Sequence, residues 1–112
     1  MEITERRTAD IVTLSLSGKL DTTTAKTFEV KILGHIESGD RRFIIDLAQL
    51  DYISSAGLRV FVLAAKRLAS GNGKIVLCSL KGPVREVFNI AGFLLDFSVY
   101  SSHDEAIKSL EP

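Results

Sequence analysis

The chain has 112 residues, of which 46% are apolar and 25% charged, a composition typical of a globular domain with a single core. Fourteen basic residues balance fourteen acidic ones without a basic block, which disfavours a nucleic-acid surface. The polar start MEITERRTAD and the lack of a long apolar run predict neither a signal peptide nor contact with a membrane. Cys78 is the only cysteine, so we expect a cytoplasmic protein with a buried, inert thiol.

The first elements along the chain are two predicted strands joined by a turn. Residues 2–6 (EITER) have a weak strand signal, and residues 7–10 (RTAD) are typical of a hairpin turn. The next strand alternates apolar and polar side chains, as a strand with one buried face does: Val12, Thr13, Leu14, Ser15, Leu16 and Ser17.

Two helices flank a central strand. Residues 20–38 predict the first helix, because apolar residues recur at helical spacing and Gly39 can close it. Residues 42–47 (RFIIDL) are apolar without alternation, which predicts a strand covered on both faces. The segment LDYISSAGLRVF then opens a second helix that runs to about Ala69, where SGNGK supplies a turn.

The remaining elements repeat this order of strand and helix. KIVLCSL, residues 74–80, predicts a second buried strand, and Gly82-Pro83 opens a third helix that ends at Gly92. FSVY predicts a short last strand, and Ser102 with Glu105 forms a capping box for a helix that ends near Leu110. Strands that alternate with helices imply a mostly parallel sheet. We expect one α/β domain over residues 1–112, with a mixed sheet of four to five strands and about four helices.

A search for catalytic or metal-binding residues finds no convincing set. His35 and His103 stand far apart and outside any ligand-spaced cluster, so each is predicted to be a surface residue of its helix. Ser55 lacks the G-x-S-x-G context of a hydrolase nucleophile, and no histidine is placed by the sequence to activate it. SGNGK precedes a strand, whereas a phosphate loop precedes a helix. We therefore expect a protein that is not an enzyme and needs no metal or cofactor.

Two serines at a strand-to-helix junction are the most informative feature. Ser54 is predicted to be the N-cap of the second helix, because its hydroxyl can accept a hydrogen bond from the first turn. Ser55 would then be the first helical residue, with its hydroxyl outward and small Ala56 and Gly57 leaving the backbone accessible. A phosphate on Ser55 would lie at the positive end of the helix dipole, so the fold should tolerate it. A docked partner would instead face about −1.5 to −2 new charges.

The second helix is more apolar than one covered face requires. Its predicted core stripe consists of Leu58, Phe61, Val62, Ala65 and Leu68. Val60, Leu63 and Ala64 extend the apolar surface beyond this stripe. Either neighbouring elements cover these three residues, or they are exposed for a protein partner.

Three segments resemble, in order and spacing, the bacterial anti-sigma factor antagonists of the STAS domain family: LSGKLDTTTAKTF, FIIDLAQLDYISSAGLRVF and PVREVFNIAGF. The resemblance covers nearly the whole chain. It implies that the unmodified protein binds an anti-sigma factor that is itself a serine kinase, which releases the sigma factor. It also implies that phosphorylation of one serine ends this complex and that a PP2C-type phosphatase restores it.

The resemblance also assigns site residues. By motif position, the phosphorylated serine is Ser55. Asp21 matches the aspartate of the G-x-L-D loop, which in such proteins lies near that serine and supports partner contact, although Asp21 could equally cap the first helix. The implied partner-binding residues are Asp21, Thr24, Ser54, Ala56, Gly57, Leu58 and Arg59. We expect a monomer or a weak dimer.

Ser54 departs from the family pattern, because well-studied members carry aspartate directly before the phosphorylated serine. This change could alter kinase recognition or allow Ser54 to be modified instead. STAS domains also occur in transport and stress-signalling complexes. The alternative is therefore a constitutive scaffold or accessory subunit, in which both serines serve only as caps.

Overall fold

A single mixed sheet forms the centre of the molecule in the computed structural model, which describes residues 1–93 and 97–111. Its strands are β1 (Glu2–Thr8), β2 (Ile11–Leu20), β3 (Arg42–Ile53), β4 (Lys74–Cys78) and β5 (Ser98–Tyr100), which are hydrogen-bonded in that order. β1 is antiparallel to β2, and the other three pairings are parallel. The predicted α/β fold with a mixed, mostly parallel sheet is confirmed.

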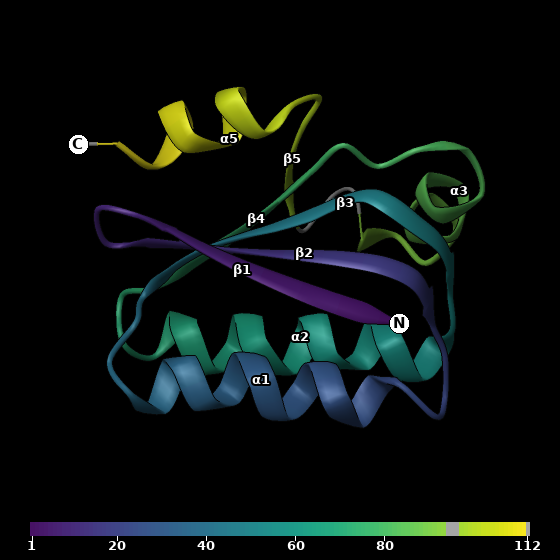
Figure 1. The fold of residues 1–112 in the computed structure, drawn as a ribbon, viewed down its shortest axis with the longest axis horizontal. Helices are drawn as coiled ribbons and strands as arrows, with labels where there is room; N and C mark the ends of the chain where they lie inside the picture. Colours follow the sequence, from purple (N-terminus) through teal and green to yellow (C-terminus); the bar gives the residue numbers. More distant parts are fainter. Residues whose placement is uncertain (94–96, 112) are drawn as a thin grey trace.

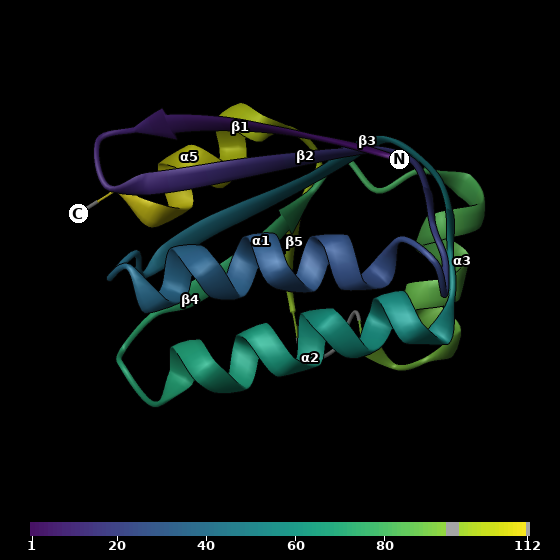
Figure 2. The same cartoon turned by 60° about the horizontal axis from the view of Figure 1, so that its bottom comes forward.

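Helices cover both faces of this sheet. The described residues include α1 (Ala25–Glu37), α2 (Ser55–Ala69), α3 (Gly82–Ile90) and α5 (His103–Leu110). α1 and α2 lie side by side on one face, and α5 lies on the opposite face (Figures 1 and 2). α3 lies near the carboxyl ends of β2 and β3 (Figure 1). None of the helices in the described part of the chain has the length and apolarity to cross a membrane.

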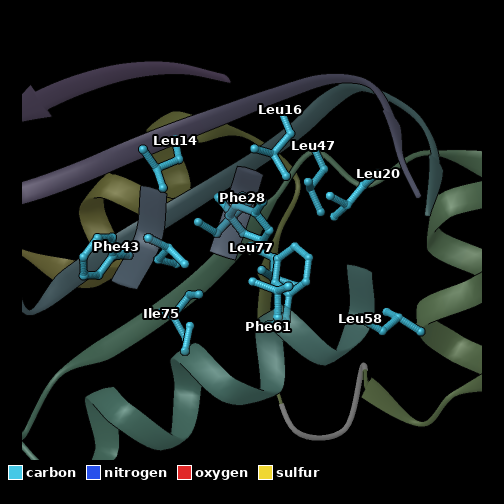
Figure 3. Packing of buried hydrophobic residues seen from close by; sticks show 14 of the residues in the cluster. Leu14, Leu16, Leu20, Phe28, Phe43, Leu47, Leu58, Phe61, Ile75 and Leu77 are labelled. Carbon is cyan, nitrogen blue, oxygen red and sulfur yellow. The ribbon is translucent and has the colours of Figure 1, made fainter. Parts of the chain in front are cut away.

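Two apolar clusters join these layers. The larger lies between the sheet and helices α1 and α2, where Phe28 and Phe61 point toward the strands (Figure 3). The ring centroids of Phe28 and Phe61 are 5.1 Å apart, and those of Phe61 and Phe88 are 5.4 Å apart, within the range in which aromatic pairs add to the energy of burial. The smaller cluster lies between the sheet and α5 and contains Ile11, Ile44, Val76, Cys78, Ala106 and Leu110.

The strands follow the predicted burial, with one exception. Phe43 and Ile45 of β3 belong to the larger cluster, and Ile44 between them belongs to the smaller one, so β3 is covered on both faces as predicted. β2 was expected to leave its polar face open, yet Thr13 is buried. The Thr13 hydroxyl oxygen lies 2.8 Å from Nε2 of His103, because α5 covers this part of the polar face.

Several element boundaries differ from the predicted ones by a few residues. β1 continues to Thr8, because the hairpin turn is shorter than expected and places Ala9 at a φ of 55°. α1 begins only at Ala25, since residues 21–24 form a separate hydrogen-bonded turn. β3 extends beyond RFIIDL to Ile53, which brings its end next to the end of β2.

The predicted helix ends in the last third of the chain are confirmed. Gly92 follows α3 with a φ of 78°, a left-handed conformation that glycine adopts without strain. Ser102 precedes α5, and its Oγ accepts a hydrogen bond from the N–H of Glu105 at 3.2 Å. Pro83 is the second residue of α3 and not the first, a position that also needs no N–H donor.

The buried face of α2 is rotated from the predicted stripe. The buried residues of this helix are Gly57, Leu58, Val60, Phe61, Ala64 and Leu68. Val62 and Ala65, which were expected in the core, are only partly buried. Val60 and Ala64, which share one face of the helix, are buried instead. Val60 lines a groove together with Ala25 of α1, and α1 lies beside α2 (Figure 2). Cover by a neighbouring element therefore explains these two residues, whereas Leu63 stays partly exposed.

Candidate partner-binding site

The two loops that carry the predicted site residues meet at one edge of the sheet. β2 and β3 are parallel neighbours, and their last residues, Leu20 and Ile53, are register partners. The backbone N–H of Ser54 also donates a hydrogen bond to the carbonyl oxygen of Leu20 at 2.9 Å. Asp21 and Ser54, which directly follow these strand ends, therefore leave the sheet side by side, although they are far apart in the sequence.

Ser54 caps α2 as predicted. Its backbone is extended, with φ −98° and ψ 171°, and its Oγ accepts a hydrogen bond from the N–H of Gly57 at 3.2 Å. Its carbonyl oxygen accepts the first bond of the helix, from the N–H of Leu58 at 3.0 Å. The cap satisfies one donor of the first turn and leaves the N–H groups of Ser55 and Ala56 without an intrahelical acceptor.

Ser55 is the first residue of α2 and is exposed. Its hydroxyl forms no hydrogen bond with any residue in the described part of the chain. The partial positive charge at the start of the helix lies directly beneath it. The hydroxyl is therefore open to another molecule, which is the steric condition for its modification by a kinase.

Gly57 and Leu58 are buried, which corrects the expectation that Gly57 leaves the backbone accessible. A Cβ atom on Gly57 would lie 2.7 Å from Cγ of Leu20 and 3.1 Å from Cγ1 of Ile53. The missing side chain therefore lets α2 approach the ends of β2 and β3 closely. Of the site residues predicted on α2, those that remain at least partly accessible are Ser55, Ala56 and Arg59.

Asp21 orders the turn that precedes α1. Its Oδ1 accepts hydrogen bonds from the hydroxyl of Thr23 at 2.7 Å and from the N–H groups of Thr23 and Thr24 at 2.9 and 3.1 Å. The hydroxyl of Thr24 in turn donates to the carbonyl oxygen of Lys19 at 2.8 Å. These bonds, above all the one from the Thr23 hydroxyl, lower the pKa of Asp21, because they favour the charged form. Asp21 is thus a carboxylate held in a fixed position.

The structural role of Asp21 is compatible with partner contact. All the described hydrogen bonds of its carboxylate use Oδ1, so within the described residues Oδ2 has no donor. Thr24 is the N-cap residue of α1 but forms no side-chain cap. The carboxylate therefore organises the loop beside Ser54, and contact of Asp21 or Thr24 with a partner stays a prediction.

α1 and α2 lie side by side (Figure 2). A shallow groove lies between them and includes Ala56 and Arg59, which are close to Ser55 in the sequence. It has a volume of about 160 Å³ and is lined by Ala25, Lys26, Glu29, Ala56, Arg59, Val60 and Leu63. Its floor is apolar, and Lys26, Glu29 and Arg59 supply the charges at its rim. None of the site residues predicted from the sequence lies on α1. The excess of apolar residues on α2 was the one sequence signal that pointed to this surface.

The two histidines connect distant elements and are not simple surface residues, so that prediction was wrong. Nδ1 of His35 lies 2.9 Å from Oδ2 of Asp40, and its Nε2 lies 3.3 Å from Oε1 of Glu5. His103 is hydrogen-bonded to Thr13, as described above. Both imidazoles thus attach a helix to the sheet and are engaged away from the candidate site.

The described residues of this site include neither a metal-binding cluster nor a reactive thiol. Among residues 1–93 and 97–111, no group of three or more His, Cys, Asp or Glu side chains could hold a metal ion. Cys78 is buried between the sheet and α5. Burial raises the pKa of its thiol to about 11, so the thiol is protonated at neutral pH, as expected of an inert cysteine.

The fold and the site define a small α/β domain that presents an accessible hydroxyl at the start of a sheet-covering helix. Residues 2–106 match the STAS domain family, and the chain belongs to this family. It is 42% identical over 106 residues to BtrV of Bordetella bronchiseptica, which is named as a candidate anti-sigma factor antagonist. The aligned region covers 95% of this chain and 91% of BtrV.

Solved structures with the same fold include two anti-sigma factor antagonists at low sequence identity. The candidate antagonist TM1081 of Thermotoga maritima aligns with a TM-score of 0.92 and 21% identity, over 96% of this chain and 93% of that one. The phosphorylated form of the Bacillus cell fate determinant SpoIIAA aligns with a TM-score of 0.79 and 22% identity, over 98% of this chain and 100% of that one. These alignments establish the STAS fold.

Proposed function

We propose that this chain is an anti-sigma factor antagonist and that phosphorylation of Ser55 ends its complex with the anti-sigma factor. The observation that carries the proposal is the exposed Ser55 at the start of a capped helix, between the Asp21 turn and the groove of α1 and α2. The 42% sequence identity with BtrV, over 91% of the length of BtrV, supports assignment to the anti-sigma factor antagonists. The partner in this proposal is an anti-sigma factor with serine kinase activity, and a PP2C-type phosphatase reverses the modification.

The covalent step transfers a phosphoryl group from a nucleoside triphosphate to Ser55. A bond forms between Oγ and the γ-phosphorus while the bond from that phosphorus to the bridging oxygen breaks, and the nucleoside diphosphate leaves. The hydroxyl proton passes to a base of the kinase, because both histidines of this chain are hydrogen-bonded elsewhere. The antagonist thus contributes an exposed nucleophile and no catalytic group.

The phosphate is expected to act on binding and to leave the fold intact. The N–H groups of Ser55 and Ala56, which have no intrahelical acceptor, and the helix dipole favour an anion at this position. A partner packed on the same surface would face about −1.5 to −2 additional charges, which the phosphate brings into the interface. Where an acidic group of the partner lies opposite, the repulsion can cost several kcal/mol.

Phosphorylation is tested by incubation of the protein with its cognate anti-sigma kinase and ATP, followed by peptide mapping in a mass spectrometer. We expect one phosphate on Ser55 of the wild-type chain and on the Ser54→Ala variant, and none on Ser55→Ala. A phosphate on Ser54, or on neither serine, would overturn the assignment.

The effect on binding is tested by calorimetry with the unmodified anti-sigma factor. We expect Ser55→Ala to bind like the wild type and Ser55→Asp to bind about tenfold or more weakly, because a charge enters the interface. Thr8→Asp adds the same charge at the exposed hairpin end of β1 and should leave the affinity unchanged. Equal affinities of Ser55→Ala and Ser55→Asp would remove the electrostatic mechanism. Recovery of membrane-transport subunits in place of a kinase would favour the constitutive accessory role.

A further inference from the structure

Arg59 lies one helical turn beyond Ser55 on α2. Residues four positions apart share a face of a helix and are separated by about 6 Å along its axis. Arg59 is exposed. The ion pairs of the described residues do not include its guanidinium. The side chain can therefore turn toward the Ser55 oxygen without breaking an existing ion pair in that part of the chain.

The charges around Arg59 favour an added anion. α2 contains Arg59, Lys66 and Arg67 and no acidic residue. Glu29 of α1 lines the same groove as Arg59, but its carboxylate lies 3.6 Å from Nζ of Lys26. An anion at the start of α2 could thus bind the guanidinium of Arg59, which forms no ion pair with the carboxylates of the described residues.

We propose that Arg59 binds the phosphate of phosphorylated Ser55 within the same chain. This inference rests on the proposed function, since it describes the modified state of Ser55. The fork of N–H donors on a guanidinium matches two phosphate oxygens, and a pair at positions i and i+4 is the spacing at which helix side chains meet. In the unmodified chain, Arg59 stands at the rim of the groove and is available to an acidic group of the partner.

Phosphorylation then changes the charge of the binding surface in two ways. It adds negative charge at Ser55, and it withdraws the positive charge of Arg59 from the rim of the groove. Both changes oppose a partner that presents carboxylates to the start of α2. A single modification thereby reverses the local charge without any movement of the backbone.

The test uses phosphoserine installed at position 55 by codon suppression, so that no kinase is needed. The second ionisation of the phosphate is followed by 31P NMR in a pH titration at low ionic strength. A guanidinium beside the phosphate favours the dianion, so we expect Arg59→Gln to raise the midpoint by about 0.2 to 0.4 pH unit. Arg59→Lys, which keeps the charge, should restore most of the wild-type midpoint.

Arg67→Gln is the matched control, because it removes the same charge at about 18 Å from Ser55 along the helix axis, compared with about 6 Å for Arg59. It should leave the midpoint near that of the wild type. An unchanged midpoint in Arg59→Gln, or an equal rise in both Gln variants, would overturn the proposal. Failure of the kinase to modify Ser55 would instead overturn the proposed function, and it would leave the result of this titration intact.

Discussion

At the scale of single residues, Ser54 and Ser55 have the same side chain but differ in whether the hydroxyl is hydrogen-bonded to the helix or exposed. The hydroxyl of Ser54 accepts a hydrogen bond from the N–H of Gly57, whereas Ser55 is exposed. The difference arises because a residue with extended dihedrals just before a helix directs its side chain back over the first N–H groups. One serine therefore stabilises the helix, and the next is available for chemistry.

Gly57→Ala is expected to lower the free energy of unfolding by up to about 2 kcal/mol. The new Cβ would lie 2.7 Å from Cγ of the fully buried Leu20, and overpacking of about 1–3 kcal/mol should exceed the gain in helix propensity of about 1 kcal/mol. Gly34→Ala in α1 is the control, because no side chain or neighbouring element among the described residues comes within 4 Å of its added Cβ. This variant should stabilise by about 0.5–1 kcal/mol. Urea denaturation measures both. An unchanged free energy of unfolding in Gly57→Ala would show that the side chain of Leu20 moves aside at little cost, which would contradict the prediction.

At the scale of elements, β1 is attached to the rest of the fold by polar contacts as well as by its pairing with β2. Arg7 donates two hydrogen bonds to the carboxylate of Asp40, at 2.9 and 3.0 Å. Oε1 of Glu5 lies 2.7 Å from Nζ of Lys31 and 3.3 Å from Nε2 of His35. Ile3 is the only apolar residue of β1 and is partly buried, so these ion pairs fix the strand where an apolar core cannot.

This attachment should weaken in acid. The two hydrogen bonds from Arg7, and next the one from His35, lower the pKa of Asp40 from 3.8 to about 2. A carboxyl group whose pKa is lower in the folded state stabilises the fold above its unfolded pKa, and this stabilisation is lost as the pH falls through the folded pKa. Between about pH 4 and pH 2, the wild type should therefore lose more unfolding free energy than Asp40→Asn, by on the order of 1 kcal/mol after screening at the exposed Arg7.

Urea denaturation over a series of pH values measures this difference. Glu37→Gln removes a carboxylate from the exposed end of α1 and should follow the wild-type profile. Parallel profiles of the wild type and Asp40→Asn would show that the Arg7–Asp40 pair contributes nothing to folding.

At the scale of the whole molecule, Asp21 and Ser55 lie outside both apolar clusters. The clusters occupy the two sides of the sheet, and the site lies at the edge where β2 and β3 end (Figure 1). A modification at this edge can change the surface that a partner meets without disturbing the packing that holds the layers together.

The chain with phosphoserine at position 55 should melt at the temperature of the unmodified chain or up to about 5 °C above it. An anion at a helix start contributes about 0.3–1 kcal/mol, which corresponds to a few degrees in a domain of this size. Differential scanning calorimetry of both forms measures the change, with Ser55→Ala as the uncharged comparison. A lower melting temperature of the phosphorylated form would show that the phosphate acts by disrupting the fold.

Local sequence patterns determined the secondary structure, the fold class and the two serine positions at the start of α2. Periodicity reports which faces of an element are apolar, and caps report where a helix begins, because both depend on residues within a few positions of one another. Ser54, Ser102 and the apolar run of β3 were predicted correctly for this reason. The boundary of β1 was missed, since its last residues are held by pairing with β2 and by the bonds of Arg7 to Asp40, which lies far along the sequence.

Only the tertiary structure decided which residues form the surface around Ser55. Gly57 is buried because α2 packs on Leu20, and the groove exists because α1 lies beside α2. Thr13 is buried by a contact with His103, 90 residues away in the sequence. Such contacts depend on how whole elements pack and on the register of the strands, and a pattern within one element contains no information about the side chains of another.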